Sequence, residues 1–138
     1  MKRHYVIQGS SFGTLGEFAE HFSAVVLGRD QIWGGNLDAL NDILRGVGTL
    51  DEGFILTWKD DHLSREHLGH PETVRWLEGF LTTCHPANRD RLESEIEIEI
   101  EAARAGRGPT IFDHLVEIIE GHGPGGQEPG DGVELRLE

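Results

Sequence analysis

The sequence predicts an α/β fold with a small three-stranded parallel sheet and flanking helices. Short strand-forming runs occur near the start, the middle and the end of the chain, at residues 5–7, 54–58 and 133–137. Amphipathic helical patterns separate these runs, as is typical of parallel sheets with right-handed crossovers. Because 138 residues are enough for one core, we expect a single domain over residues 1–138.

The first quarter of the chain predicts a strand followed by a helix. Residues 5–7 form a β-rich run that Gly9 ends. From Thr14 to Gly28 the apolar residues recur at steps of three and four, which is a helical period. This apolar stripe consists of Leu15, Phe18, Phe22 and Val26.

A second amphipathic helix follows a glycine turn at residues 33–35, with Asn36 placed as its N-cap and Gly46 at its end. Its inward face is formed by Leu37, Leu40, Ile43 and Leu44. Its outward face carries Asp38 and Asp42, which are neighbours one turn apart and destabilise an isolated helix by about 0.2–0.5 kcal/mol. Folding gains nothing from this pair, whereas a partner with concentrated positive charge would.

The central part predicts one strand and two helices. Residues 54–58 are an apolar run expected to be covered on both faces, and 59–71 are polar and expected to be a loop with one helical turn at most. Residues 74–84 have a helical period with Trp76 at its edge. Residues 93–101 alternate Glu with Ile like a strand, but start and stop signals on both sides favour a helix.

The C-terminal part predicts a helix, a loop and a last strand. Thr110 and Asp113 have the spacing of a capping box. The helix that they begin is expected to end at Gly121 or Gly123, and the glycine-rich residues 121–132 form a loop. Its inward residues are Phe112, Leu115, Val116 and Ile119.

The composition limits the class of partner and the compartment. A formal charge of −13, from 25 acidic and 12 basic residues, argues against nucleic acids and anionic membranes and favours a basic partner. The single cysteine, Cys84, excludes an internal disulfide and is expected to be a buried apolar side chain at a helix end. We expect a cytoplasmic protein, because neither a signal peptide nor a membrane span is visible.

The sequence supports three other interpretations only weakly: a nucleotide site, a metal site and a catalytic site. The glycine-rich turn at residues 9–16 fits neither dinucleotide nor P-loop spacing, so a structural turn is expected. A metal site would have to use Asp60, Asp61, His62, His67 and His70, which have no standard ligand spacing. No nucleophile motif is visible, and we predict no enzyme, no cofactor and no metal.

Residues 33–44 carry a resemblance to a known family. Trp-Gly-Gly-Asn-Leu-Asp-Ala-Leu-Asn-Asp-Ile-Leu resembles, without a gap, the motif aromatic-Gly-x-Asn-Leu-Asp-Ala-Leu-x-Asp-x-Leu of the barstar family, intracellular inhibitors of barnase-type ribonucleases. The resemblance covers residues 4–58 and 110–138, and it implies that 59–109 are a helical insertion.

The resemblance implies that this segment blocks the active site of a basic ribonuclease or ribonuclease toxin. Asp42 matches the carboxylate that takes the place of an RNA phosphate, and Asp38 matches a second acidic contact. With the residues beside them, the expected partner-binding set is Ile32, Trp33, Gly34, Asn36, Leu37, Asp38, Asn41, Asp42, Arg45 and Gly46. The alternative is an interaction module that binds a different basic protein without inhibiting a ribonuclease.

The chain also differs from the family's pattern at three positions. Ile32 stands where the family has an aromatic residue, and Asn41 stands where it has a Trp between the two acids. Gly121, beside Glu120, stands where the last helix of the family contributes an acid.

Overall fold

The fold is centred on a parallel sheet. The computed structural model describes residues 3–28, 33, 34, 36, 37, 39–44, 53–83, 86–123, 126 and 132–138. In this part of the chain β1 (Arg3–Gln8), β2 (Phe54–Lys59) and β3 (Val133–Leu137) form one parallel sheet in the order β1-β2-β3. Phe54 pairs with Arg3 on one side and with Val133 on the other. The predicted α/β fold with three parallel strands is confirmed.

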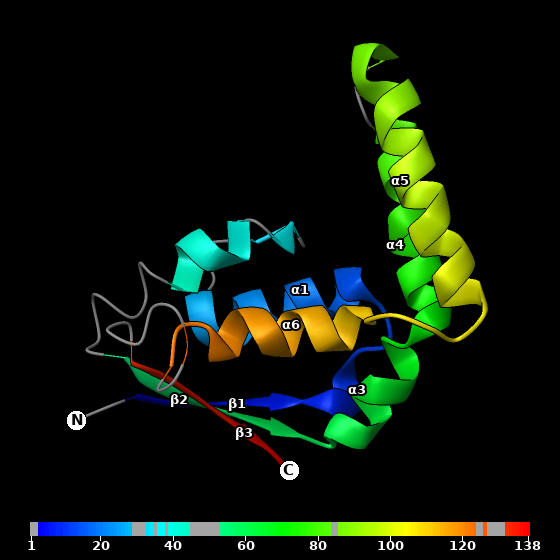
Figure 1. The fold of residues 1–138 in the computed structure, drawn as a ribbon. Coiled ribbons are helices and arrows are strands. Elements are labelled where there is room, and N and C mark those ends of the chain that lie inside the picture. Colours follow the sequence, from blue (N-terminus) through cyan, green and yellow to red (C-terminus); the bar gives the residue numbers. More distant parts are fainter. Residues whose placement is uncertain are drawn as a thin grey trace.

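Two helices, α1 (Leu15–Phe22) and α6 (Ile111–Glu120), cover one face of this sheet (Figure 1). Both contact the indole of Trp58 in β2, which is completely buried. Phe18 of α1 stacks on this ring at a centroid distance of 5.2 Å, and Phe112 of α6 meets it edge-on at 5.1 Å. The core of the molecule therefore lies between β2 and these two helices.

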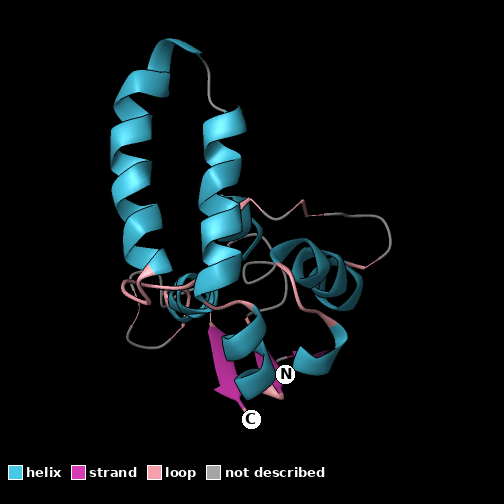
Figure 2. Cartoon of the chain, turned by 90° about the vertical axis from the view of Figure 1, so that its right-hand side faces the viewer, coloured by secondary structure: helices cyan, strands magenta, loops and turns pink. Residues whose placement is uncertain are grey.

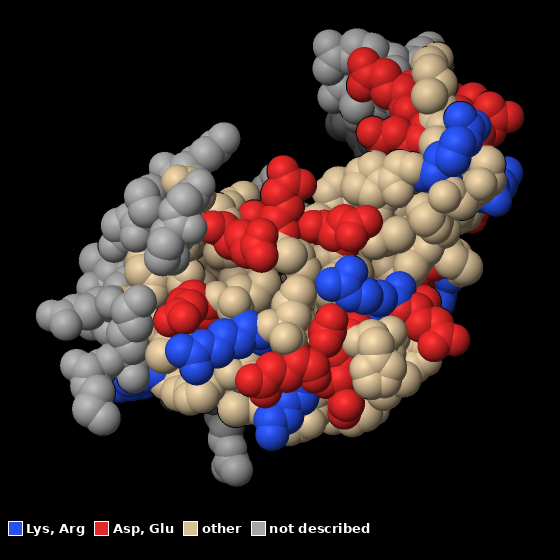
Figure 3. All heavy atoms as spheres, turned by 60° about the horizontal axis from the view of Figure 1, so that its bottom comes forward, with Lys and Arg blue, Asp and Glu red and all other residues tan. Residues whose placement is uncertain are grey.

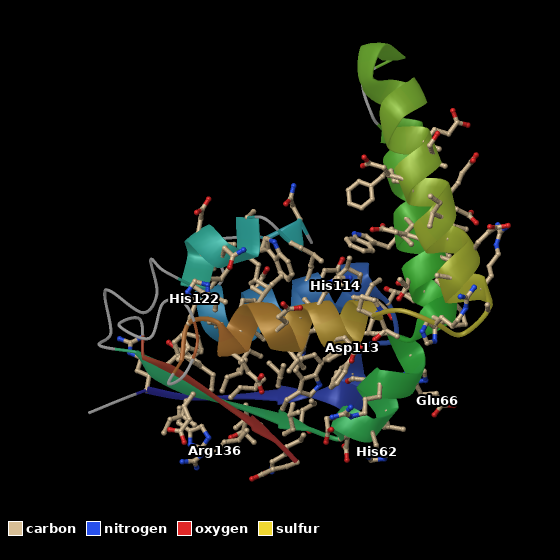
Figure 4. The ribbon with its side chains drawn as sticks, in the orientation of Figure 1. His62, Glu66, Asp113, His114, His122 and Arg136 are labelled. Atoms are coloured by element: carbon tan, nitrogen blue, oxygen red, sulfur yellow. The ribbon has the colours of Figure 1, made fainter. Side chains whose placement is uncertain are left out.

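The strand β2 is buried or half-buried on both faces, apart from Lys59 at its end. In the described part of the chain, no helix lies over the face of the sheet away from α1 and α6, so the expected cover on both faces is not found (Figure 1). On that face the His4 ring of β1 bonds the Thr57 hydroxyl at 2.7 Å. Arg136 points away from the helices in Figure 4 and pairs with Glu134 at 3.3 Å. Figure 3 shows acidic and basic side chains interleaved on the side of the molecule that comes forward in that view.

The first helix begins and ends as the sequence predicts. The Thr14 side chain accepts a hydrogen bond from the Glu17 amide, which caps α1. The helix continues as a π-helical turn, η2 (Ser23–Leu27), and stops at Gly28, whose φ of 82° is in the region that glycine adopts without strain. The short 3-10 turn η1 (Gly9–Ser11) joins β1 to this part of the chain.

The polar segment after β2 is a helix rather than the predicted loop. Residues Asp61–His67 form α3, in which the Asp61 carboxylate pairs with Arg65 one turn later at 3.2 Å. Ser64 is completely buried, and its hydroxyl accepts a hydrogen bond from the Trp58 indole at 2.9 Å. The segment has little apolar periodicity, and this contact with the core is not visible in the local sequence.

Two long helices, α4 (His70–Thr83) and α5 (Pro86–Arg104), form a hairpin that rises from the body (Figures 1 and 2). They pack through a small cluster of their own, formed by Leu77, Ile96 and Ile100. The helical prediction for 93–101 is confirmed, and Ile98, the middle residue of the alternation, is 70% exposed. Within the described residues, no helix is long and apolar enough to cross a membrane.

Among the described residues, three hydrogen bonds tie the base of this hairpin to the rest of the protein. Glu72 accepts from the Leu15 amide at the start of α1 at 2.8 Å. The Thr73 hydroxyl accepts from the Ile111 amide at the start of α6 at 3.0 Å. The His70 ring bonds the Gly108 carbonyl at 3.1 Å. Because these bonds reach both α1 and α6, the direction in which the hairpin leaves the body is fixed.

The helix α6 begins with the predicted capping box. The Thr110 hydroxyl accepts from the Asp113 amide, and the Asp113 carboxylate accepts from the Thr110 amide. After α6 the chain turns back to β3, where the Val133 amide bonds the His122 carbonyl at 3.0 Å. This turn brings the His122 ring next to the side chain of Asn41.

Candidate partner-binding surface

The predicted second helix is present, with its apolar side in the core. Residue 37 and residues 39–44 are helical, and Leu40 and Leu44 are completely buried. Asn36 caps the helix, since its side-chain oxygen accepts from the Ala39 amide at 3.2 Å. We refer to residue 37 and residues 39–44 together as the 37–44 helix. It is cyan in Figure 1, on the side of α1 and α6 away from the sheet.

The loop before this helix is held by Trp33, which is only 3% exposed. Its ring packs edge-on against Phe18 and Phe22 of α1, at centroid distances of 5.9 and 5.8 Å. The Trp33 indole donates to the Asn36 carbonyl at 2.8 Å, and its amide donates to the Ser23 hydroxyl at 2.9 Å. These contacts fasten the start of the 37–44 helix to α1.

A further contact fastens the outer side of the 37–44 helix. The His122 ring, at Nε2, lies 3.0 Å from the side-chain oxygen of Asn41, and His122 is 2% exposed. With the amide oriented in this way, Nε2 carries the proton and donates. Figure 4 shows His122 beside the 37–44 helix, just beyond the end of α6. Asn41, where the barstar motif has a Trp, is therefore tied to the C-terminal third of the chain.

The exposed side of this segment carries Asp42. Asp42, Asn36 and Gly34 are exposed, whereas Leu37 and Asn41 are half-buried. A charged carboxylate thus stands on a helix whose opposite side is fixed in the core. This arrangement presents an anion without the entropy that a flexible segment would lose on binding.

Of the predicted partner-binding residues, six lie within the described part of the chain: Trp33, Gly34, Asn36, Leu37, Asn41 and Asp42. The other four, Ile32, Asp38, Arg45 and Gly46, lie outside the described residues, as does Cys84. The ring of Trp33 is inside the core, so it cannot contact a partner directly. Its effect on binding is to hold the loop in position. His122 could not be predicted as part of this surface, because a lone histidine after a helix has no local sequence pattern.

The glycine-rich turn at residues 9–16 is a structural turn, as expected. At the start of α1, where a phosphate would bind, the Leu15 amide is taken by the Glu72 carboxylate. The Gly13 amide is taken by Glu17 at 2.9 Å. Two carboxylates of the chain itself therefore occupy amides that a nucleotide phosphate would need.

The histidine-rich segment does not gather metal ligands in the part of the chain that the structure describes. No group of three or more His, Cys, Asp and Glu side chains there is arranged to hold a metal ion. Asp61 pairs with Arg65, and His70 bonds a carbonyl, so both side chains have other partners. His67 ends α3 and His70 begins α4, so they do not share one helical face.

One titratable group beneath the surface has a displaced pKa. Burial lowers the pKa of His21 in α1 from the usual value of 6.5, because the charged ring is poorly solvated there. Its Nε2 accepts a hydrogen bond from the Gln8 amide at 3.0 Å, which requires an unprotonated nitrogen. The neutral ring of His21 therefore joins α1 to the end of β1.

Comparison with known proteins gives one match. The family model described as Barstar (barnase inhibitor) matches residues 3–103, which include β1, the 37–44 helix, β2 and most of the hairpin. Comparisons with curated proteins and with solved structures found no match. With a match over more than half of its length and the parallel three-stranded fold, the chain belongs to the barstar family, whose members are inhibitors of barnase-type ribonucleases.

Proposed function

We propose that this protein is an inhibitor or immunity protein that blocks the active site of a basic ribonuclease or ribonuclease toxin. The blocking element is the loop at residues 33–36 together with the 37–44 helix. The observation that carries the proposal is the exposed carboxylate of Asp42 on a helix that is fixed from its other side. Membership of the barstar family supports it.

The proposed chemistry is the replacement of a phosphate by a carboxylate. A ribonuclease cleft holds cationic side chains that bind the RNA phosphate, and a carboxylate makes strong charge-assisted hydrogen bonds with such groups. Asp42 supplies this carboxylate, and Asp38 supplies a second acidic contact. Gly34, Asn36, Leu37 and Gly46 add contacts around them.

The total charge supports a basic partner that is met by diffusion. A chain with a formal charge of −13 attracts a cationic protein over a distance limited by salt screening. Such attraction raises the association rate more than it raises the lifetime of the complex. The inhibitor is proposed to act in the cytoplasm, where it would protect the cell from the enzyme.

We also propose a domain organisation, which the two apolar clusters support. Residues 4–58 and 110–138 form the core of a single domain over 1–138, and 59–109 are an insertion. The larger cluster takes most of its members from β1, α1, β2, α6 and β3, together with Trp33, Leu40 and Leu44, and Leu68 is added from the insertion. The hairpin has a smaller cluster of its own.

The proposal is tested by titrating the protein into barnase and into a panel of other small basic guanyl-preferring ribonucleases while RNA cleavage is followed. We expect at least one enzyme to be inhibited at a one-to-one ratio, and rising salt to slow the association. Protein binding without inhibition of any enzyme would contradict the inhibitor proposal and leave the interaction module. If the protein binds none of these ribonucleases, then neither the inhibitor proposal nor the interaction module holds for ribonucleases as partners.

A further inference from the structure

We propose that the α4–α5 hairpin carries a second contact surface for the same basic protein, centred on Phe80 and flanked by Glu95 and Glu99. We refer to these three residues as the hairpin surface. The inference rests on the proposed function, since it assigns the hairpin to the partner that Asp42 binds. It gives the insertion a role in selecting that partner.

A row of aromatic rings leads from the body onto the hairpin. The Trp76 ring in α4 contacts the His114 ring in α6 at a centroid distance of 5.6 Å. Phe80, one turn further along α4, meets Trp76 edge-on at 5.1 Å. Phe80 ends the row with 43% of its surface exposed. A large ring that is held by a second ring and still exposed has the form of an interface anchor.

The hairpin and the 37–44 helix both lie on the side of α1 and α6 away from the sheet (Figure 1). The helix α6 joins the two places, since His114 near its start contacts Trp76 and His122 just beyond its end bonds Asn41 (Figure 4). His114 is six residues from the end of α6, about 9 Å along the helix axis, and His122 follows two residues after that end. An interface of about 800 Å² per partner is about 30 Å across, so one protein can cover both.

The side of the hairpin that carries Phe80 also carries acidic residues, as does the opposite side. Glu97 and Glu101 of α5, with Glu78 of α4, line a groove on one side of the hairpin. Residues two apart in a helix point in nearly opposite directions, at about 200°. Phe80 therefore lies on the side of α4 away from Glu78, and Glu95 and Glu99 lie on the side of α5 away from the groove. Both carboxylates are exposed.

The negative charge of the hairpin distinguishes between two possible binding partners of this surface, a second copy of the chain and a basic protein. A second copy of the chain would bring two molecules with a formal charge of −13 together at their acidic hairpins, which opposes association. A basic protein gains from the same charges. The three bonds at the base of the hairpin hold its direction before binding, so little conformational entropy is lost.

The test compares two exposed apolar residues of the hairpin. Phe80→Ala and Ile98→Ala each remove an exposed side chain, but Ile98 lines the groove on the other side of the hairpin and is not part of the hairpin surface. Binding is measured with barnase and with the ribonuclease of the panel that binds most tightly. We expect Phe80→Ala to weaken binding about tenfold, mostly through faster dissociation, and Ile98→Ala to change it less than twofold.

The charged residues give a second, independent comparison. The pair Glu95→Gln and Glu99→Gln is expected to slow association severalfold at low salt, whereas Glu97→Gln with Glu101→Gln has a smaller effect although the net charge is the same. Urea unfolding and sedimentation check that every variant stays folded and in the wild-type oligomeric state.

The outcomes separate this inference from the proposed function. If Asp42→Ala weakens binding but Phe80→Ala and the Glu95/Glu99 pair do not, the hairpin surface is overturned and the proposed function stands. Equal losses for Phe80→Ala and Ile98→Ala, or a dimer that Phe80→Ala dissociates, also overturn it. If the wild-type chain binds no ribonuclease, the proposed function fails and the hairpin surface fails with it.

Discussion

The His122 ring and the Asn41 side chain form a partly buried hydrogen bond between residues that are 81 positions apart, at a distance of 3.0 Å. This bond joins the 37–44 helix to the turn between α6 and β3. It fixes the helix on its outer side, while Leu40 and Leu44 fix it from within. The direction in which Asp42 points therefore depends on both ends of the chain.

We expect His122→Leu to lower the free energy of unfolding by about 1–3 kcal/mol, because the Asn41 amide would lose its buried partner. Asn41→Leu in the same chain should recover part of this loss, so that the double variant loses less than the sum of the two. Urea unfolding of the four proteins measures the coupling. His4→Leu is the control, since the bond from His4 to Thr57 lies on the outer sheet face and should matter less. Additive losses would contradict a direct link.

We expect Asp42→Ala to weaken binding to an inhibited ribonuclease by at least about 3 kcal/mol, because the cations of the enzyme would be buried without a partner. The free energy of unfolding is measured beside the binding free energy, to show that the variant stays folded. Calorimetric titration and urea unfolding give the two quantities. Glu97→Ala on the hairpin groove is the control, and an equal loss there would refute the role of Asp42.

We expect Glu72→Ala to lower the free energy of unfolding by about 1.5–3 kcal/mol, because a charged acceptor for the Leu15 amide is removed. The matched control is Glu78→Ala, since Glu78 is also in α4 but pairs with Arg104 at an exposed site. Surface pairs of this kind contribute about 0–1 kcal/mol. Thermal and urea unfolding compare the two variants, and similar losses for both would argue against a fixed hairpin base.

We expect the protein to lose stability as the pH falls below about 6.5, in part because of His21. Burial lowers the pKa of His21 in the folded protein, so near this pH the unfolded chain binds more protons than the folded one. The stabilising contribution is complete above the ordinary pKa of 6.5 and is lost toward the lower pKa of the folded state. His21→Gln keeps an acceptor for the Gln8 amide without titrating. Urea unfolding at pH 7.5 and 5.5 should show a smaller loss for this variant than for the wild type.

Elements with a clear local period could be predicted from the sequence. Neighbouring residues alone determine three of these patterns: the apolar stripe of α1, the capping box of α6 and the alternation of β3. Each element is found where expected. Even the ambiguous Glu–Ile segment was decided by its flanks, since a helix start and stop enclose it.

The contacts that hold the candidate site could not be predicted in this way. Glu72 bonds a residue 57 positions away, and His122 bonds one 81 positions away. The helix α3 was missed because it is stabilised by the bond from Ser64 to Trp58 rather than by an apolar stripe. The exposure of Phe80 depends on where α4 leaves the body, which is settled by the bonds at its base.

The bond between Asn41 and His122 also affects the order in which parts of the molecule fold during synthesis. Residues 37–44 leave the ribosome early, but the ring that steadies them is made 81 residues later, which takes about 4–16 s at the usual rates of synthesis. Closing so long a loop is among the slower steps of folding, because its entropy is lost before the contact forms. A nascent chain that stops before α6 would carry Asp42 on a helix without this support. The surface proposed to block a ribonuclease is thus among the last parts of the molecule to be completed.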